Sequence, residues 1–369
     1  MTTPLITDYH ELKNVLQFTL SNVNYSMANA IRRTIVSDIP CFVFKTTPYS
    51  ESKCEITKNT SKFNNEIVKQ RLSCIPIHLK DTSLDVTNYT LILNVKNDTN
   101  DVMYVTTEHF KIYDEELKKF IDESNVKKIF PADPISNRYI EFIRLKPQIS
   151  SDLEGEEINL KCKFSVSTAK ENGMYNVVST CAYGNTIDID ESDKHWEKKE
   201  KELKKNEIDA GQISVEKKNW NLLNSQRYNI PNSFDFKIET IGVYDNKELL
   251  TKSCEILINN LKSLDFESKN IQITDSKSTI ANSFDIIFID QDYTLGKVLE
   301  YYMFKNYYEN KDEKKLTYCG FSKDHPHNNE IIIRLGFIEE TDPSKIKPLF
   351  SHVIEESIEH LNMILEQIK

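Results

Sequence analysis

The stretch LQFTLSNVNYSMANAIRRTIVSDIP, residues 16–40, decides how this chain is organised. It begins with Leu16, Phe18 and Leu20, which alternate with polar residues. That alternation has the period of a β-strand with one buried face. The stretch therefore predicts a strand at its start, followed by a change to a helical pattern.

A helix is predicted directly after this strand. Asn22 and Asn24 supply side-chain oxygens suited to an N-cap, and Pro40 prevents the helix from running further. Arg32 and Arg33 point away from the apolar face of this helix. That face repeats at helical spacing and consists of Met27, Ala28, Ile31 and Ile35.

A second unit of the same build lies near the other end of the sequence, at residues 284–308. Phe284, Ile286 and Phe288 form its alternating strand, and Asp292 is placed to cap its helix. The apolar face of that helix is Leu295, Val298, Leu299 and Tyr302. The recurrence predicts that one chain contains both halves of a two-part assembly.

Each half continues with a further strand and helix. In the first half these are an alternating strand at residues 234–239 and a helix that reaches Leu264. In the second half they are a hairpin at residues 316–338 and a final helix from about Lys347 to the chain end. Pro348 suits the first turn of this last helix, and the face opposite its apolar stripe is charged.

The first half is interrupted at residues 49–227, which we interpret as an inserted domain. It contains β-like runs at residues 89–95, 140–145 and 160–166 and ends in a charged stretch at residues 188–219. Glutamate and lysine at i,i+4 spacing in that stretch favour an exposed linker helix. The alternative is a surface on which a partner docks.

The composition is that of a folded protein with two or three domains, because the chain has 369 residues and single cores stop growing at about 250–300 residues. A net charge of −10 argues against a stand-alone nucleic-acid binder. No stretch is apolar for long enough to act as a secretory signal or membrane span, so an intracellular location is expected.

Motifs for metal, cofactor or catalytic chemistry are missing from the sequence. The seven cysteines include no C-x-x-C pair, and the eight glycines form no phosphate-binding loop. An EF-hand loop starting at Asp188 would need glycine where the chain has Asp193. His325 and His327 have no third ligand at a supporting spacing, so a turn is favoured there. We expect no catalytic residue, metal or cofactor.

Several motifs, in this order, resemble those of a known family: the amino-terminal assembly domain of the RNA polymerase alpha subunit and its counterparts, the third and eleventh subunits of RNA polymerase II. Those that resemble the third subunit are residues 26–35 with Asp38-Ile39-Pro40, residues 66–77 and residues 169–178. Those that resemble the eleventh subunit are residues 292–297 and Asp324-His325-Pro326 ahead of a strand at residues 331–335. The resemblance covers almost the whole chain.

The resemblance implies an α+β fold, with an alpha-subunit-like dimerisation domain formed as an intramolecular pseudo-dimer and a mainly β inserted domain. Residues 1–48 and 228–270 would form the first half, residues 271–369 the second, and residues 49–227 the insertion. The implied function is a non-catalytic scaffold subunit of a multisubunit DNA-directed RNA polymerase. An alternative of another class is an α+β adaptor that binds proteins unrelated to transcription.

The resemblance also implies partners. The two largest polymerase subunits would assemble on this chain, small zinc-binding subunits would join them, and DNA would be reached only through the complex. Neither a membrane nor a homo-oligomer is expected. A chain in which both halves are fused resembles the corresponding subunits of large DNA viruses. That resemblance implies a role in viral transcription, within a polymerase complex that is located in a virion or in host cytoplasm. Two family features have no counterpart: a four-cysteine zinc loop and a DNA-binding C-terminal domain.

Site residues follow from the same resemblance. Large-subunit docking is predicted for Asn29, Arg32, Arg33, Arg71, Ile75 and Pro76, the alternative for the arginine pair being ordinary solvated side chains. The predicted interface between the halves is Ala28, Ile31, Ile35, Leu257, Leu261, Leu295, Gly296, Leu299, Val353 and Leu361. Gly296 lies inside a predicted helix, where glycine costs about 1 kcal/mol relative to alanine. We interpret it as a close approach to a helix of the first half, the alternatives being a tolerated weak point or a later helix start.

Overall fold

The computed structural model describes residues 3–148, 150 and 154–368. Contacts divide these residues into two compact units. Unit 1 comprises the described residues of Met1–Ile35, Thr180–Glu239 and Asn246–Lys369, and unit 2 those of Val36–Ser179 and Thr240–Asp245. Unit 2 differs from the insertion expected at residues 49–227, because the segment after Ser179 belongs by its contacts to unit 1.

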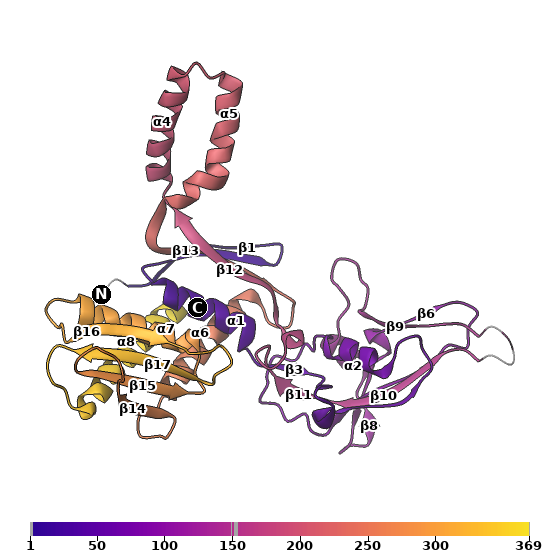
Figure 1. The fold of residues 1–369 in the computed structure, drawn as a ribbon. Coiled ribbons are helices and arrows are strands. Elements are labelled where there is room, and N and C mark those ends of the chain that lie inside the picture. Colours follow the sequence, from indigo (N-terminus) through magenta and orange to yellow (C-terminus); the bar gives the residue numbers. More distant parts are fainter. Residues whose placement is uncertain (1–2, 149, 151–153, 369) are drawn as a thin grey trace. The chain divides into compact units, whose positions relative to one another are not determined.

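The first sheet of unit 1 includes the strands labelled β1, β12 and β13 in Figure 1. Its strand order is β1-β2-β13-β12. Its strands are β1 (Leu5–Leu12), β2 (Val15–Ser21), β12 (Val178–Ile187) and β13 (Asn229–Thr240). β2 pairs antiparallel with β13, and the rings of Phe18 and Phe236 stack with centroids 5.0 Å apart. Leu16, Phe18 and Leu20 are buried, so the alternating strand predicted from the opening stretch is confirmed.

The second sheet of unit 1 has the strand order β14-β15-β17-β16. Its strands are β14 (Ile271–Asp275), β15 (Ser283–Ile289), β16 (Leu316–Ser322) and β17 (Glu330–Phe337). β16 and β17 pair antiparallel, which confirms the predicted hairpin. β15 lies between β14 and β17, and alternate residues along it are buried.

Four helices accompany these sheets: α1 (Tyr25–Ser37), α6 (Asn246–Lys262), α7 (Tyr293–Phe304) and α8 (Ile346–Ile368). The Asn24 side-chain oxygen accepts a hydrogen bond from the Ser26 amide at 2.9 Å, and the Asp292 carboxylate accepts one from the Thr294 amide at 2.8 Å. Both predicted caps are therefore confirmed. α7 continues into a π-helical turn at Lys305–Glu309.

The two halves of unit 1 share one order of elements along the chain, β-β-α-β-β-α. The first half runs β1, β2, α1, β12, β13, α6, and the second runs β14, β15, α7, β16, β17, α8. The order of strands across each sheet matches as well, because β1, β2, β13 and β12 take the places of β14, β15, β17 and β16. The recurrence seen in two stretches of sequence thus extends over every strand and helix of both halves.

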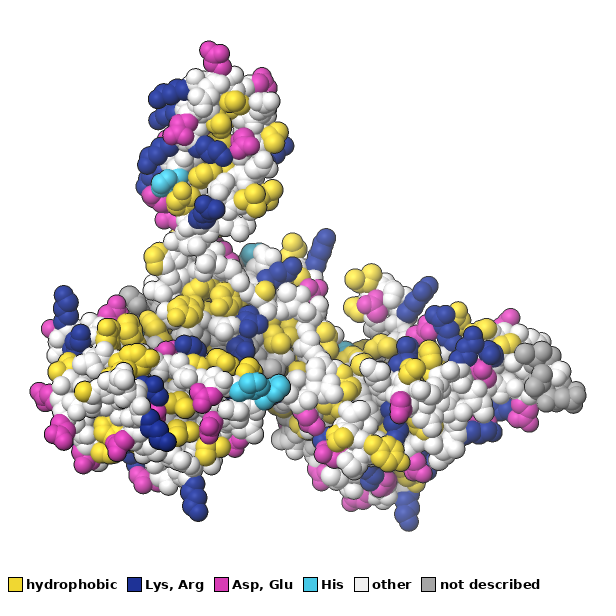
Figure 2. Space-filling model, viewed as in Figure 1, with side chains coloured by type: hydrophobic (Ala, Val, Ile, Leu, Met, Phe, Trp, Pro, Cys, Tyr) yellow, Lys and Arg dark blue, Asp and Glu magenta, His cyan; other side chains and the backbone are white. Residues whose placement is uncertain are grey.

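The charged stretch forms two helices, α4 (Ile189–Lys205) and α5 (Ala210–Asn219), where one linker helix was expected. Trp196 and Trp220 explain the difference, since their rings pack at a centroid distance of 5.9 Å and Trp220 donates to the Ser192 hydroxyl at 3.2 Å. Asp188 caps α4 through the Glu191 amide. Acidic and basic side chains are interspersed over this hairpin (Figure 2).

Unit 2 is mainly β. A five-stranded sheet has the order β4-β10-β5-β7-β8, and two smaller sheets pair β3 with β11 and β6 with β9. The strands are β3 (Cys41–Val43), β4 (Cys54–Asn59), β5 (Tyr89–Lys96), β6 (Met103–Thr106), β7 (Lys111–Asp114), β8 (Lys119–Phe120), β9 (Glu141–Leu145), β10 (Glu157–Lys163) and β11 (Ser165–Ser167). Two helices, α2 (Asn65–Ser73) and α3 (Glu123–Ile129), cover an apolar core that includes Phe44, Phe110 and Phe142.

Candidate assembly interface

The two halves of unit 1 meet through their helices. α6, from the first half, runs close to α8, from the second half, and α7 also lies against α8. All ten residues predicted at this interface are buried. Each of these helices therefore buries its predicted apolar stripe, and α7 buries part of its stripe against β16 and β17 of its own half.

Polar contacts join α1 to α7. The Arg33 guanidinium donates to the Asp292 carboxylate at 3.1 Å and to the Thr294 hydroxyl at 2.9 Å. The C-terminal part of α1 thus lies beside the N-terminus of α7.

Arg33 was expected to face outward toward another subunit. The structure instead places its side chain on the N-cap of α7, where Asp292 serves both as cap and as ion-pair partner. A single sequence gives no signal for this pairing, because the two residues belong to different halves and each has a sufficient local explanation. We therefore treat Arg33 as part of the contact between the halves.

We expect Arg33 and Asp292 to be energetically coupled. The side chains are 35% and 31% exposed, so the coupling free energy should be about 0.5–1 kcal/mol. A double-mutant cycle measures this coupling, from urea unfolding of the wild type, Arg33→Ala, Asp292→Ala and the double variant. Asp292→Ala also removes the helix cap, and the cycle cancels that separate loss of stability. The more exposed pair Lys347 and Glu267 serves as the control and should show weaker coupling. Zero coupling between Arg33 and Asp292 would contradict this contact.

The end of α8 also reaches the first half. The Gln367 side-chain oxygen accepts from the Ile6 amide at 2.8 Å, and its nitrogen donates to the Pro4 carbonyl at 2.8 Å. β1 is a strand whose side chains are almost all exposed, so its sequence carries no alternation and it was not predicted. The hydrogen bonds of Gln367 to Ile6 in β1 and to Pro4 just before it tie this edge of the first sheet to the second half.

Gly296 makes the close approach that was expected, but with a different neighbour. A Cβ built at this position would lie 2.3 Å from the Phe321 ring and 2.6 Å from the Ile331 side chain. Both belong to the hairpin of the same half, β16 and β17, and not to a helix of the first half. Gly296 therefore allows α7 to lie tightly on its own sheet.

Polar residues lie buried between α7 and α8, among the apolar side chains of these helices. Tyr302 and His360 hydrogen-bond at 2.5 Å, and burial raises the pKa of Tyr302 and lowers that of His360, so both are neutral. Glu356 is only 3% exposed, and its carboxylate accepts from Asn306 at 2.5 Å and faces Lys305 at 3.7 Å. These partners offset only part of the cost of burying the carboxylate, because its Oε1 atom is buried without a hydrogen bond.

The remaining predicted docking residues differ in what they contact. Asn29 and Arg32 are half-buried on α1, and the Arg32 guanidinium donates to the Asn29 side-chain oxygen at 3.0 Å. Burial raises the pKa of the nearby Cys181 thiol to about 12, and the Arg32 charge opposes that rise. Both α1 side chains therefore keep part of their surface available to another chain.

In unit 2, the predicted docking block is largely occupied by contacts within the unit. The Arg71 guanidinium donates to the carbonyl oxygens of Phe142 and Glu141 at 2.6 and 2.9 Å, which ties α2 to β9. Ile75 is 5% exposed and belongs to the apolar core. Pro76 is half-buried. Arg71 and Ile75 thus have structural roles that sequence reasoning did not separate from docking.

Across residues 3–148, 150 and 154–368, no group of three or more His, Cys, Asp or Glu side chains is placed to hold a metal ion. Of the helices described, none combines the length and apolar character that crossing a membrane requires.

Comparison with known proteins adds to this geometry. The family described as the RNA polymerase Rpb3/Rpb11 dimerisation domain matches residues 17–261. The chain belongs to that family. The matched span begins in β2 and ends in α6, so it covers the first half of unit 1 except β1 and all described residues of unit 2.

Relatives of this Rpb3/Rpb11-family chain include polymerase subunits. It is 28% identical over 125 residues to the DNA-directed RNA polymerase subunit Rpo3 of Pyrococcus furiosus, covering 32% of this chain and 41% of the relative. It is 23% identical over 201 residues to the human DNA-directed RNA polymerases I and III subunit RPAC1, covering 49% and 54%. It is also 24% identical over 190 residues to a conjugation stage-specific protein of Tetrahymena thermophila, covering 47% and 56%. The matches span about half the length of these relatives.

Proposed function

We propose that this chain is a non-catalytic assembly subunit of a multisubunit DNA-directed RNA polymerase, in which two dimerisation halves are paired within one polypeptide. The observation that carries the proposal is the shared β-β-α-β-β-α order of the two halves, with matching strand order in their sheets. Family membership and the names of two relatives as RNA polymerase subunits support it.

Pairing within one chain has a physical consequence. A covalent link that spans two sites gives the second contact an effective concentration of about millimolar, so the halves need no separate dimerisation step. The paired helices then form a platform that is complete as soon as the chain folds. In this proposal the two largest polymerase subunits assemble on that platform, small zinc-binding subunits join, and the chain resides in the polymerase complex. Because both halves are fused in one chain, as in the subunits of large DNA viruses that the chain resembles, we also propose a viral source.

The docking surface in this proposal is narrower than the set predicted from sequence. Asn29 and Arg32 on α1 and Pro76 after α2 keep exposed surface, whereas Arg33, Arg71 and Ile75 make contacts within the chain. Arginine is favoured at such interfaces because its planar guanidinium binds carboxylates with two parallel hydrogen bonds. Arg32 is therefore the residue on which the experiment should concentrate.

Copurification tests the proposal. The tagged chain, co-expressed with the two largest polymerase subunits of its own source, is expected to retain both. Arg32→Glu should weaken retention by roughly 30-fold, the effect of losing about 2 kcal/mol at an interface hot spot. Lys205→Glu, on the α4–α5 hairpin, is the charge-matched control and should bind normally. A folded chain that retained neither large subunit would refute the proposal and favour an adaptor unrelated to transcription.

A further inference from the structure

Two cysteines of unit 2 face each other across neighbouring strands. Cys54 on β4 is the register partner of Cys162 on β10 in an antiparallel pair. The Lys163 amide donates to the Lys53 carbonyl at 3.2 Å, so the neighbouring pair of residues is the hydrogen-bonded one. Hydrogen-bonded and non-hydrogen-bonded residue pairs alternate along antiparallel strands. Cys54 and Cys162 are therefore a non-hydrogen-bonded pair, in which the Cα atoms are about 4.5 Å apart.

That geometry suits a disulfide. Disulfides form between residues whose Cα atoms are about 4.4–6.8 Å apart and whose side chains lie on the same side of the sheet. Both side chains are buried, and the Cys162 thiol donates to the Lys163 carbonyl at 3.6 Å. In the described strands no other cysteine faces a second one, since Cys41 lies opposite Ser167 and Cys319 opposite Leu335.

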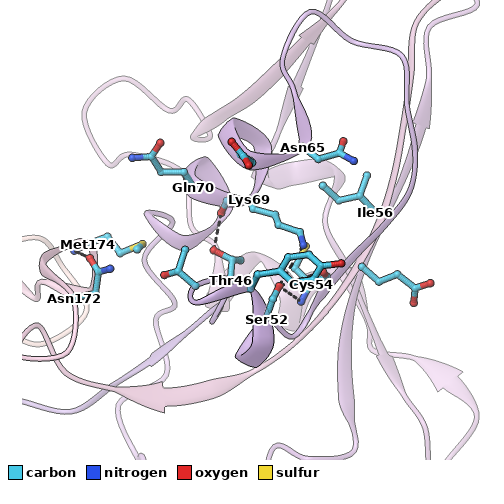
Figure 3. Close-up of a pocket in the computed structure, with 13 residues that line it drawn as sticks. Thr46, Ser52, Cys54, Ile56, Asn65, Lys69, Gln70, Asn172 and Met174 are labelled. Carbon is cyan, nitrogen blue, oxygen red and sulfur yellow. Dashed lines mark hydrogen bonds between the residues drawn. The ribbon is translucent and has the colours of Figure 1, made fainter.

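The two thiols differ in their access to solvent. Cys54 lines an open pocket of about 1100 Å³, together with Thr46, Ser52 and Lys69. Figure 3 shows the Lys69 side chain reaching toward Ser52 and Cys54 from α2. Cys54 is 6% exposed and Cys162 is 1% exposed. A small reagent in the pocket therefore reaches Cys54 before the more deeply buried Cys162.

The two thiols also differ in reactivity. The neighbouring Cys162 side chain lowers the pKa of Cys54 against the opposing effect of burial, and the Lys69 charge adds to the lowering. The neighbouring Cys54, together with burial, raises the pKa of Cys162. The Lys69 ammonium is held near Cys54 by its hydrogen bond to the Ser52 hydroxyl at 3.4 Å. The thiolate is the reactive form of cysteine, so Cys54 is the nucleophile of the pair.

We propose that Cys54 and Cys162 form a reversible redox site, in which a peroxide entering the pocket oxidises the pair to a disulfide. The Cys54 thiolate attacks one peroxide oxygen, the O–O bond breaks, and the hydroxide released takes up a proton to leave as water. Cys162 then attacks the Cys54 sulfenic sulfur, the S–O bond breaks, and a second water leaves with the Cys162 proton. The two sulfurs lose two electrons in total, and one peroxide becomes two waters.

This site is independent of the proposed role in polymerase assembly. A dithiol reductant returns the pair to thiols by exchange through Cys54, the sulfur that faces the pocket. In the oxidised state a covalent bond joins β4 to β10 beneath the pocket floor. The chemistry requires only unit 2 and a peroxide, so it can be tested without any partner subunit.

The test uses the full chain and hydrogen peroxide, followed by alkylation under denaturing conditions and peptide mapping. The expected result is one new linked peptide joining Cys54 to Cys162, near-complete loss of alkylation at both positions, and recovery with dithiothreitol. Cys74 is exposed and serves as an internal reference, because its oxidation shows that the peroxide concentration is high enough to react with an exposed thiol. Full alkylation of Cys54 and Cys162 at peroxide concentrations that oxidise Cys74 would overturn the proposal.

Variants separate the two steps. In Cys162→Ala, Cys54 should stop at sulfenic acid and be labelled by dimedone, whereas in Cys54→Ala no linked peptide should form and Cys162 should remain alkylatable. Cys41→Ala is the matched control, since Cys41 is buried in the same unit without a facing cysteine, and it should leave the linked peptide unchanged. Linkage of Cys54 to any other cysteine in the wild-type chain would contradict the site, whatever the variants show.

Discussion

Gly296→Ala is expected to destabilise the protein, although alanine is the better helix former. In a helix with free surroundings the change would stabilise by about 1 kcal/mol. At this position the new Cβ would lie 2.3 Å from the Phe321 ring, so the ring, the helix or the hairpin must move. Overpacking of a buried site costs about 1–3 kcal/mol, which outweighs the gain in helix propensity. Gly296→Leu should cost more, because four carbons must be accommodated.

Urea unfolding of the full chain measures this effect. Gly184→Ala on β12 is the matched control, since a Cβ there meets nothing within 4 Å. The double variant Gly296→Ala with Phe321→Leu should recover part of the loss, because the smaller side chain vacates space beside α7. A rise in the unfolding midpoint for Gly296→Ala alone would show that the contact with Phe321 is not restrictive.

The second large effect is expected from cutting the chain between its halves. Fragments 1–270 and 271–369, expressed together, should copurify, because α6 and α8 bury their apolar faces against each other. Cutting removes an effective concentration of about millimolar, so at micromolar protein the free energy of unfolding should fall by about 4 kcal/mol. The unfolding midpoint should then depend on protein concentration, which it does not for the intact chain.

Two neighbouring residues on α6 provide the control. Leu261 is buried and Lys262 is exposed. Leu261→Asp places an unpaired carboxylate in an apolar interface and should abolish copurification of the fragments, whereas Lys262→Asp should leave it intact. Two soluble fragments that do not associate would exclude the internal pairing of the halves.

The sequence was sufficient for the central elements of both halves, because they carry strong local signals. β2 and β15 alternate, α1 and α7 are capped by Asn24 and Asp292, and Pro40 lies beyond the end of α1. The edge strands β1 and β14 were missed, since exposed edges need no buried face and so leave no alternation. The split into α4 and α5 was missed because it depends on two tryptophans that meet only after the chain turns back.

Pairings between distant residues could not be predicted. Arg33 was correctly excluded from the apolar stripe, but its attachment to the α7 cap depends on how the halves meet. Gly296 was correctly read as a close approach, yet its neighbour Phe321 follows from the packing of α7 on its own hairpin. The burial of Glu356 and His360 was not predicted, because their partners Asn306 and Tyr302 lie on another helical segment, distant in the sequence.

The matched order of elements also has a practical consequence for engineering the chain. In the first half, unit 2 occupies the connection from α1 to β12, and the α4–α5 hairpin occupies the connection from β12 to β13. The corresponding connections of the second half, residues 305–315 and 323–329, are short. The fold accommodates long insertions at these two points of the first half. We therefore expect the same two points of the second half to accept an affinity tag or a fluorescent domain.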